Sequence, residues 1–527
     1  VDELSYEIRS MDTKRLIADA KVDSYSQKNG VITADLPIQN LLDSNAEYLL
    51  IIHLLHGDDT LNYYTRIIEP QDCYVKESID FAKDFHEKTF QEDGSGSLAT
   101  YMEPDSSADN TTLANVSIHS TLRQVTWDKF NGTVLTDPSV SIKEINNSYN
   151  VILLDYVVTA TGDNGELEYY NVEEYYKVRY TDQQIYLLDY QRSMEQIIDT
   201  ASVNVSGNIL SVGVTSDTTG YLSNETGTIV SFVQSGQLFE YNQNKQTFTK
   251  VYGFIDDPTD ARQSYGQHNI RILNIDETGN MDFVVYGYMN RGQHEGESGI
   301  DLYHYDSIKQ EAIEQVFIAT THSYQILNAD FSDLLYENAD GDFYIMMGGT
   351  LAKVGLDDLS TKELITNLKS DQYAVSSSGR YVAWMTEDDV ADQISIMDLE
   401  TEKVRTIDAA KGTRIKPLAF MTEDFVYGIA NESDISTDAA GSAVYPMAKV
   451  EIIDTSSDNF TQLKEYAKDG IYVTGATKSS YTLYLDRVTK QDGTYVTTTQ
   501  DTIKDTAGEQ NKTVSLVKTA SDTQGLA

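Results

Sequence analysis

The chain has 527 residues, of which 83 are acidic and 39 are basic, so its formal net charge is −44. Charge of this sign repels nucleic acid and anionic membranes, and we expect neither as a partner. Hydrophobic residues make up 40% of the sequence, which excludes a disordered chain, and the length predicts two or three domains.

Three features bear on the compartment. The chain has one cysteine, Cys73, and therefore no internal disulfide framework. No apolar run is long enough to span a bilayer, so we expect no direct membrane insertion by these residues. The many Tyr, Thr, Asn, Ser and Asp residues, with only 7 Pro, resemble the composition of surface-exposed proteins of Gram-positive bacteria. From this composition we expect a location outside the cytoplasm. Because the first residue is Val1, we expect a mature form, an excised ectodomain or a fragment.

Residues 1–70 are predicted to be β-strands throughout. Segments that alternate between apolar and polar residues follow one another from residue 4 to residue 68, and the turns between them contain Asp, Asn or Gly. The pattern is typical of half or more of a β-sandwich, so we predict a β-sandwich-like segment. A strand so close to the first residue indicates that the natural protein continues upstream and that this segment is incomplete.

Residues 71–202 combine one helix with later strands. A helix is predicted over residues 74–90, where the apolar residues at helical spacing are Tyr74, Ile79, Ala82, Phe85 and Phe90. Alternating strands follow from residue 139 to residue 191. This order of elements resembles the cystatin-like α+β class, so we predict a small α+β domain with one helix and an antiparallel meander.

From residue 203 to residue 527, one unit recurs. Six hairpins, each with an alternating apolar strand, a polar turn and a second strand, begin at Leu238, Leu302, Leu351, Ile394, Val450 and Tyr481. The first five starts lie roughly 45 to 65 residues apart, near the repeat length of propeller blades. One blade cannot bury both faces of its sheet, so we predict a β-propeller of about six to seven blades. Residues 203–223 supply strands of a further blade or close the ring. The alternative is a run of unrelated hairpins in a sandwich.

A candidate calcium loop lies in the segment RILNIDETGNMDFVVYGY, residues 271–288. The segment resembles the FG-GAP repeat of integrin-type propellers, in which a D-x-D-x-D-G-x-x-D loop holds calcium. The resemblance implies these metal ligands: Asn274, Asp276, Thr278 and Asp282. Only two of the four are carboxylates, which weakens calcium binding. The alternative is a hairpin in which Asp276 caps its own turn and Gly279 supplies a positive φ.

A Gly-rich insertion, residues 289–299, follows this segment. The densest group of polar side chains in the repeats lies in and after it: His294, Glu295, Glu297, Asp301 and His304. An insertion that projects from a rigid fold is a candidate ligand-binding loop, and the alternative is an ordinary solvated loop.

The stretch of residues 373–407 contains all four strands of one repeat unit. Its first two strands flank the turn at residues 376–379, and a hairpin follows across residues 400–402. This arrangement resembles the TolB-type β-propeller repeat, which has Ser-Pro-Asp-Gly where this chain has Ser-Ser-Ser-Gly. The resemblance implies a fold but no particular activity.

The sequence contains no Gly-x-Ser-x-Gly nucleophile elbow, no zinc-protease motif and no phosphate loop. We therefore expect a non-catalytic extracytoplasmic protein that presents a rigid propeller face to a glycan, a peptide or a partner protein. The alternative is a carbohydrate-active enzyme with an Asp/Glu acid–base pair at the propeller channel. Two inward-facing carboxyl groups at glycosidase separation, one of them with a raised pKa, would favour the enzyme.

Overall fold

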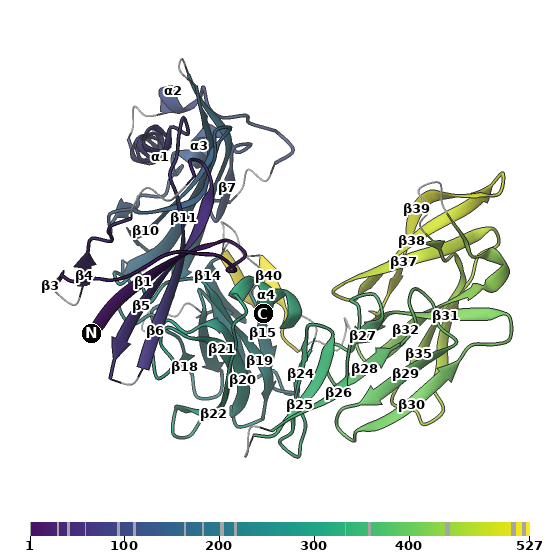
Figure 1. Ribbon diagram of the computed structural model, residues 1–527. Coiled ribbons are helices and arrows are strands. Elements are labelled where there is room, and N and C mark those ends of the chain that lie inside the picture. The colour runs from purple at the N-terminus through teal and green to yellow at the C-terminus, as the bar shows by residue number, and fades with distance from the viewer. Residues whose placement is uncertain are drawn as a thin grey trace. The chain divides into compact units, whose positions relative to one another are not determined.

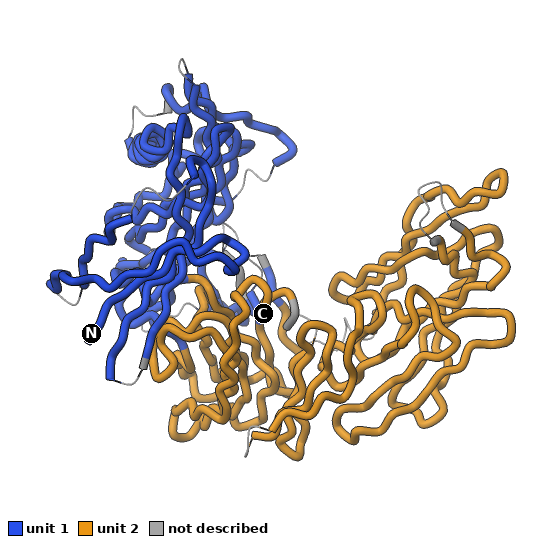
Figure 2. The backbone as a smooth tube through the Cα atoms, in the orientation of Figure 1, with its two compact units in different colours: residues 1–220, 253–265, 516–527 blue, residues 221–252, 266–515 orange. Residues whose placement is uncertain are grey.

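The computed structural model describes residues 2–28, 31–38, 43–57, 59–91, 95–108, 112–162, 165–181, 184–200, 205–215, 219–331, 334–356, 360–437, 443–506, 513–518 and 523–527. This part of the chain is mainly β, as predicted, and its sheets are antiparallel (Figure 1). It forms two compact units. The first contains residues 1–220, 253–265 and 516–527, and the second contains residues 221–252 and 266–515 (Figure 2).

The first unit begins with a four-stranded sheet in the order β2-β1-β5-β6, with these bounds: β1 Glu3–Ser10, β2 Leu16–Lys21, β5 Glu47–His56 and β6 Asp59–Ile68. Alternate residues of β1 are buried, because successive side chains of a strand point to opposite faces. Tyr6, Ile8, Tyr48 and Leu50 form the core of this sheet. A separate short hairpin consists of β3 Tyr25–Lys28 and β4 Val31–Ala34.

The helix predicted over residues 74–90 is present as α1, Val75–Thr89. Its apolar face packs on a curved antiparallel sheet, where the Phe85 ring lies 5.6 Å from Tyr176 and 4.9 Å from Tyr190. The sheet contains β7 Asn115–Ser117, β8 Thr133–Val134, β9 Ser139–Ile145, β10 Asn150–Thr161, β11 Leu167–Tyr180 and β12 Ile185–Ile197. Two short helices, α2 Ser95–Leu98 and α3 Leu122–Val125, complete this region. This region therefore combines one long helix with an antiparallel sheet.

A further sheet of the first unit joins strands that are far apart in the sequence. Its order is β13-β14-β41-β40, with these bounds: β13 Val205–Ser206, β14 Ile209–Val214, β40 Leu516–Lys518 and β41 Thr523–Leu526. The domain boundary predicted at residue 203 lies outside the described residues.

The second unit contains four successive sheets of four strands. The first has β15 Tyr221–Ser223, β16 Ile229–Gln234, β17 Gln237–Asn242 and β18 Thr247–Tyr252. The second has β19 His268–Ile275, β20 Met281–Tyr288, β21 Ser298–Asp306 and β22 Glu311–Ala319. The third has β23 Leu335–Glu337, β24 Phe343–Met347, β25 Thr350–Val354 and β26 Thr361–Ile365. The fourth has β27 Tyr373–Val375, β28 Tyr381–Trp384, β29 Gln393–Asp398 and β30 Lys403–Asp408.

The fifth sheet of this unit has seven strands: β31 Thr413–Met421, β32 Asp424–Asn431, β35 Met447–Asp454, β36 Thr461–Tyr466, β37 Ile471–Ser479, β38 Thr482–Gln491 and β39 Thr494–Lys504. The shorter elements are α4 Tyr324–Phe331, η2 Glu432–Asp434, β33 Ser436–Thr437 and β34 Ala443–Val444. In the described part of the chain, no helix is long and apolar enough to cross a membrane.

All six predicted hairpins are present in the second unit: β17–β18, β21–β22, β25–β26, β29–β30, β35–β36 and β38–β39. Neighbouring sheets bury their apolar faces against each other. Tyr344 of the third sheet and Val382 of the fourth share one core, with Trp384 packed at its edge. Ile396 of the fourth sheet and Phe425 of the fifth share the next. The sheets therefore stack in chain order.

Candidate functional site

The second sheet, β19–β22, carries both groups of residues that the sequence singles out. The candidate calcium loop joins β19 to β20, and the Gly-rich insertion joins β20 to β21.

His294 lies in the insertion, which folds back on itself where the Met289 N–H donates a hydrogen bond to the Glu297 carbonyl at 2.9 Å. The imidazole stacks on Phe317 with 3.7 Å between the ring centroids and 10° between the planes. Its Nε2 lies 3.1 Å from Glu314 Oε1, and its Nδ1 lies 3.8 Å from Glu297 Oε1. The ring is thus held in one plane, with a carboxylate facing each nitrogen.

Asp301 lies on β21 and is only 1% exposed. Its Oδ2 accepts a hydrogen bond from the Tyr303 hydroxyl at 2.6 Å, whereas Oδ1 has no hydrogen-bond partner among the described residues. Burial raises the pKa of Asp301 to about 7; the Tyr303 hydrogen bond opposes this rise and the charge of Glu314 adds to it. Burial also raises the pKa of Tyr252, whose hydroxyl lies 3.5 Å from that of Tyr303, to about 12.

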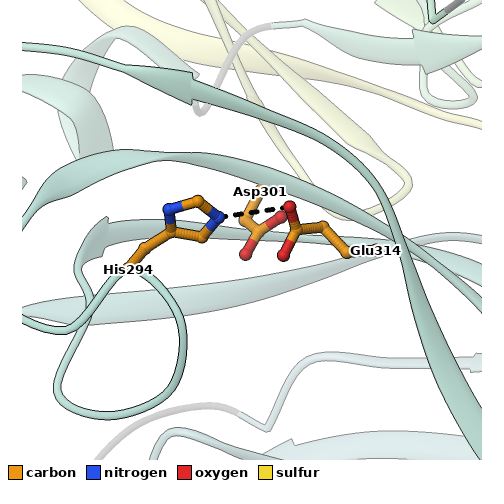
Figure 3. A group of neighbouring side chains, drawn as sticks. All are labelled: His294, Asp301 and Glu314. Atoms are coloured by element: carbon orange, nitrogen blue, oxygen red, sulfur yellow. Dashed lines mark hydrogen bonds and ion pairs between the residues drawn. The ribbon is translucent and has the colours of Figure 1, made fainter.

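The pairing of β21 with β22 brings Glu314 close to Asp301 and His294. Tyr303 pairs with Glu314 and Asp301 pairs with Phe317, and a bulge shifts the register between these two pairs. Paired residues share a face of the sheet, so the bulge turns Glu314 and Phe317, three positions apart, to the face that Asp301 occupies. As a result, single donor atoms of His294, Asp301 and Glu314 lie within 4.8 Å of one another (Figure 3).

The structure therefore assembles part of the predicted ligand-binding group. His294 and Asp301 have donor atoms within 4.8 Å of each other, and Glu297 lies 3.8 Å from His294. Glu295 instead lies 3.9 Å from Arg291, and His304 lies elsewhere on β21. The sequence interpretation missed Glu314, which sits in the second strand of a correctly predicted hairpin. The local sequence pattern places Glu314 in a strand, but its position beside Asp301 depends on the bulge between β21 and β22.

His304 belongs to a different group of charged residues. Its Nδ1 lies 2.6 Å from Asp282 Oδ1, and both side chains are near Glu337 of the third sheet. Burial raises the pKa of Glu337 to about 7; Asp282 adds to this rise and His304 opposes it. Asp282, a predicted calcium ligand, thus has a histidine partner.

The other predicted calcium ligands form a tight turn. Asp276 accepts hydrogen bonds from the backbone N–H groups of Thr278 at 2.7 Å and Asn280 at 3.0 Å, and from both of their side chains. Asn274 Oδ1 accepts from the Asp282 N–H at 3.3 Å. Burial acts to raise the pKa of Asp276, but these hydrogen bonds outweigh it and lower the pKa. The alternative of a self-capped turn accounts for this geometry, and calcium binding here stays a prediction.

The same turn occurs in four successive sheets of the second unit. In each, the first residue accepts a side-chain hydrogen bond from a backbone N–H four or five positions later, and a glycine of positive φ follows it by three positions. The first residues are Asn224, Asp276, Asn338 and Ser376, and the glycines are Gly227, Gly279, Gly341 and Gly379. The calcium-like motif is therefore one copy of a repeated structural turn.

Three of these turns are each contacted by a different glutamate, which comes from the next sheet along the chain. Glu277 accepts hydrogen bonds from the Thr226 hydroxyl at 2.8 Å and from the Asn224 amide at 2.9 Å. Glu423 accepts from the Ser378 hydroxyl at 2.9 Å and from its backbone N–H at 3.1 Å. Glu400 accepts from the Tyr336 hydroxyl and the Ala339 N–H. We call these interactions the inter-sheet carboxylate contacts.

The core of the first unit holds a buried polar network that the sequence interpretation missed. Glu174 is fully buried and accepts hydrogen bonds from His86, Tyr176 and Tyr190 at 2.9 to 3.1 Å. Burial acts to raise the pKa of Glu174, but His86 and the other nearby donors outweigh it and lower the pKa. Because both carboxylate oxygens are used within the core, this network stabilises the fold of the α+β region.

No protein-family model and no curated protein sequence matches this chain. Among solved structures, it is similar to an acylaminoacyl peptidase of Pyrococcus horikoshii, with 13% identity over 72% of this chain and 55% of that one and a TM-score of 0.28. It is similar to dipeptidyl peptidase 4 of Porphyromonas gingivalis, with 13% identity over 70% and 54% and a TM-score of 0.28. It is also similar to a protein of unknown function from Desulfotomaculum acetoxidans, with 12% identity over 61% and 90% and a TM-score of 0.26. The chain spans about half the length of the two peptidases, and scores this low assign no activity.

Proposed function

We propose that the protein is a non-catalytic binding protein of the extracytoplasmic space, whose stacked sheets present a rigid surface to a glycan, a peptide or a partner protein. The observation that carries the proposal is the set of inter-sheet carboxylate contacts, made by Glu277, Glu400 and Glu423. They fix the spacing between neighbouring sheets. A surface whose side chains are already in place loses less conformational entropy when a ligand binds.

We also propose that the stacked sheets are the blades of a propeller with about six to seven blades. Four sheets have the expected four strands, and the seven-stranded sheet contains enough strands for nearly two more. In the first unit, the pairing of β14 with β41 puts strands from both ends of the predicted repeat region into one sheet. Such a sheet leaves fewer free strand edges.

One observation favours the alternative of a carbohydrate-active enzyme. Asp301, whose pKa is raised to about 7, has a carboxylate oxygen within 4.8 Å of one of Glu314. The carboxyl groups of retaining glycosidases are about 5–5.5 Å apart, and one of them has a raised pKa. The 1% exposure of Asp301 argues against this role, because a sugar would have to reach a carboxyl group enclosed by protein.

A glycan and peptide array, combined with a turnover screen of the same compounds, distinguishes the two functions. We expect saturable binding of one ligand class without product release. Sustained turnover that is lost in both Asp301→Asn and Glu314→Gln would overturn the binding proposal in favour of the enzyme. Asp282→Asn, which removes a charge from the same sheet, is the control.

A further inference from the structure

We propose that His294, Asp301 and Glu314 form a binding site for a divalent transition metal, with Zn²⁺ as the preferred ion. The donors are one imidazole nitrogen and oxygens of two carboxylates, and the three lie within 4.8 Å of one another (Figure 3). Borderline ions such as Zn²⁺ take this mixture of nitrogen and oxygen ligands. The inference goes beyond the proposed binding function and does not depend on it.

A buried oxygen without a partner points to the bound ion. Asp301 is 1% exposed, and its Oδ1 has no hydrogen-bond partner in the described part of the chain. A buried carboxylate oxygen without a partner is unfavourable, and a cation at that position removes the penalty. In Figure 3 the Asp301 carboxylate lies between the side chains of His294 and Glu314.

The surroundings of His294 select the nitrogen that would bind the metal. Glu297 faces Nδ1 at 3.8 Å, and the ring is stacked on Phe317. Nε2 is the nitrogen that belongs to the donor group, because it is directed at Glu314 Oε1 3.1 Å away, and a metal there would displace the proton that the imidazole shares with this carboxylate. The remaining ring proton would then be on Nδ1, on the side of Glu297, and a carboxylate on that side is a common support of metal-binding histidines. The ring therefore has the support that metal-binding histidines usually have.

One donor pair already has a spacing close to that of a small tetrahedral ion. Zinc bonds of about 2.0–2.2 Å place two tetrahedral donors about 3.4 Å apart. The separation of His294 Nε2 from Glu314 Oε1 is 3.1 Å, so the ion would replace the hydrogen bond between them with little movement. Calcium requires about six to eight oxygen ligands, and the imidazole and the small donor number disfavour it. A water would supply the fourth ligand.

Calorimetric titration of the full chain with Zn²⁺, after treatment with a chelator, tests the site. We expect one tight equivalent of zinc that millimolar Ca²⁺ does not displace. His294→Ala and Asp301→Asn should each weaken this binding at least about 100-fold, and Glu297→Gln about 10-fold through the supporting contact. His304→Ala, which changes a carboxylate-paired histidine of β21 outside the proposed site, should leave it unchanged.

Two measurements keep the result interpretable. Metal-free Asp301→Asn should unfold at a temperature no lower than the parent chain, because it removes a buried charge and keeps an acceptor for Tyr303. X-ray absorption at the zinc edge should show one imidazole in a shell of nitrogen and oxygen ligands. Zinc binding of equal affinity in the parent chain and in the folded His294→Ala and Asp301→Asn variants would mean adventitious binding by the acidic surface only, and would overturn the proposal. So would the absence of a tight equivalent.

Discussion

Burial raises the pKa of three carboxyl groups in the second unit to about 7: Glu240, Asp301 and Glu337. Each has one buried oxygen without a hydrogen-bond partner among the described residues. The three come from three different sheets: β17 of the first, β21 of the second and β23 of the third. A buried carboxylate that stays charged at neutral pH lowers the stability of the fold, so these positions are candidates for function or for stabilising substitution.

Replacing Glu240 tests this electrostatic penalty. Its folded pKa of about 7, caused mainly by burial with Lys245 opposing and Asp276 adding, lies above the ordinary value of 4.5. The folded state therefore binds the proton more tightly, and stability falls as the pH rises from 4.5 to 7. We expect Glu240→Gln to be more stable than the parent chain by about 1–3 kcal/mol at pH 8 and equal to it near pH 4.5.

Urea unfolding at the two pH values measures the difference. Exposed Glu225 provides the control, since Glu225→Gln should change stability at neither pH. A Glu240→Gln variant that is no more stable than the parent at pH 8 would show that the buried acid carries no penalty.

Substitution of Asp276 distinguishes a purely structural turn from a calcium-binding loop. Its hydrogen bonds serve the turn, as those of Asn338 serve the turn of the next sheet. In calcium-free buffer we expect Asp276→Ala and Asn338→Ala to lower the free energy of unfolding by similar amounts, about 1–2 kcal/mol each. Thermal unfolding with added calcium then decides whether an ion binds. A rise in Tm for the parent and for Asn338→Ala, but not for Asp276→Ala, would establish the calcium site.

At the scale of elements, the inter-sheet carboxylate contacts hold neighbouring sheets together. Glu277 and Glu225 occupy the second position of equivalent turns. Of the two, as far as the structure describes the chain, only Glu277 accepts hydrogen bonds from the turn of the preceding sheet. We expect Glu277→Ala to lower the free energy of unfolding by about 1–3 kcal/mol, because donors on Asn224 and Thr226 lose their acceptor. Glu225→Ala should change it by less than about 0.5 kcal/mol. Equal effects of the two substitutions in chemical unfolding would mean that the contact contributes nothing.

The elements were predictable from the sequence because their signals are local. The alternation of residues and the turn glycines locate the hairpins, and α1 follows from its helical spacing. Two of the three residues of the candidate site, His294 and Asp301, could be predicted because they lie in or next to the insertion. Glu314 could not, because a bulge that shifts the strand register by one residue places it beside them. The pairing of β14 with β41 could not be predicted, because the local residue pattern of a strand does not specify which distant strand it pairs with.

At the scale of the whole molecule, β41 completes the sheet that joins both ends of the repeat region. It lies between β14 and β40 and pairs with both. Removing residues 519–527 should leave two strand edges unpaired and expose the apolar side of β14, which includes Leu210 and Val212. We expect the shortened protein to aggregate and to unfold at a lower temperature. Light scattering and calorimetry measure both effects, and a monomeric product of unchanged Tm would contradict the role of β41.

The pairing of β14 with β41 also sets an order of events during synthesis. The two strands are roughly 300 positions apart, and contacts of such separation form late because of the entropy of closing the loop. The ribosome completes β14 long before it reaches residue 523, whereas each hairpin of the second unit has both strands available within seconds of translation. Nascent chains therefore carry an open edge on β14 until residues 523–526 have been synthesised. A chaperone that shields this edge would act on the growing polypeptide before β41 pairs with β14.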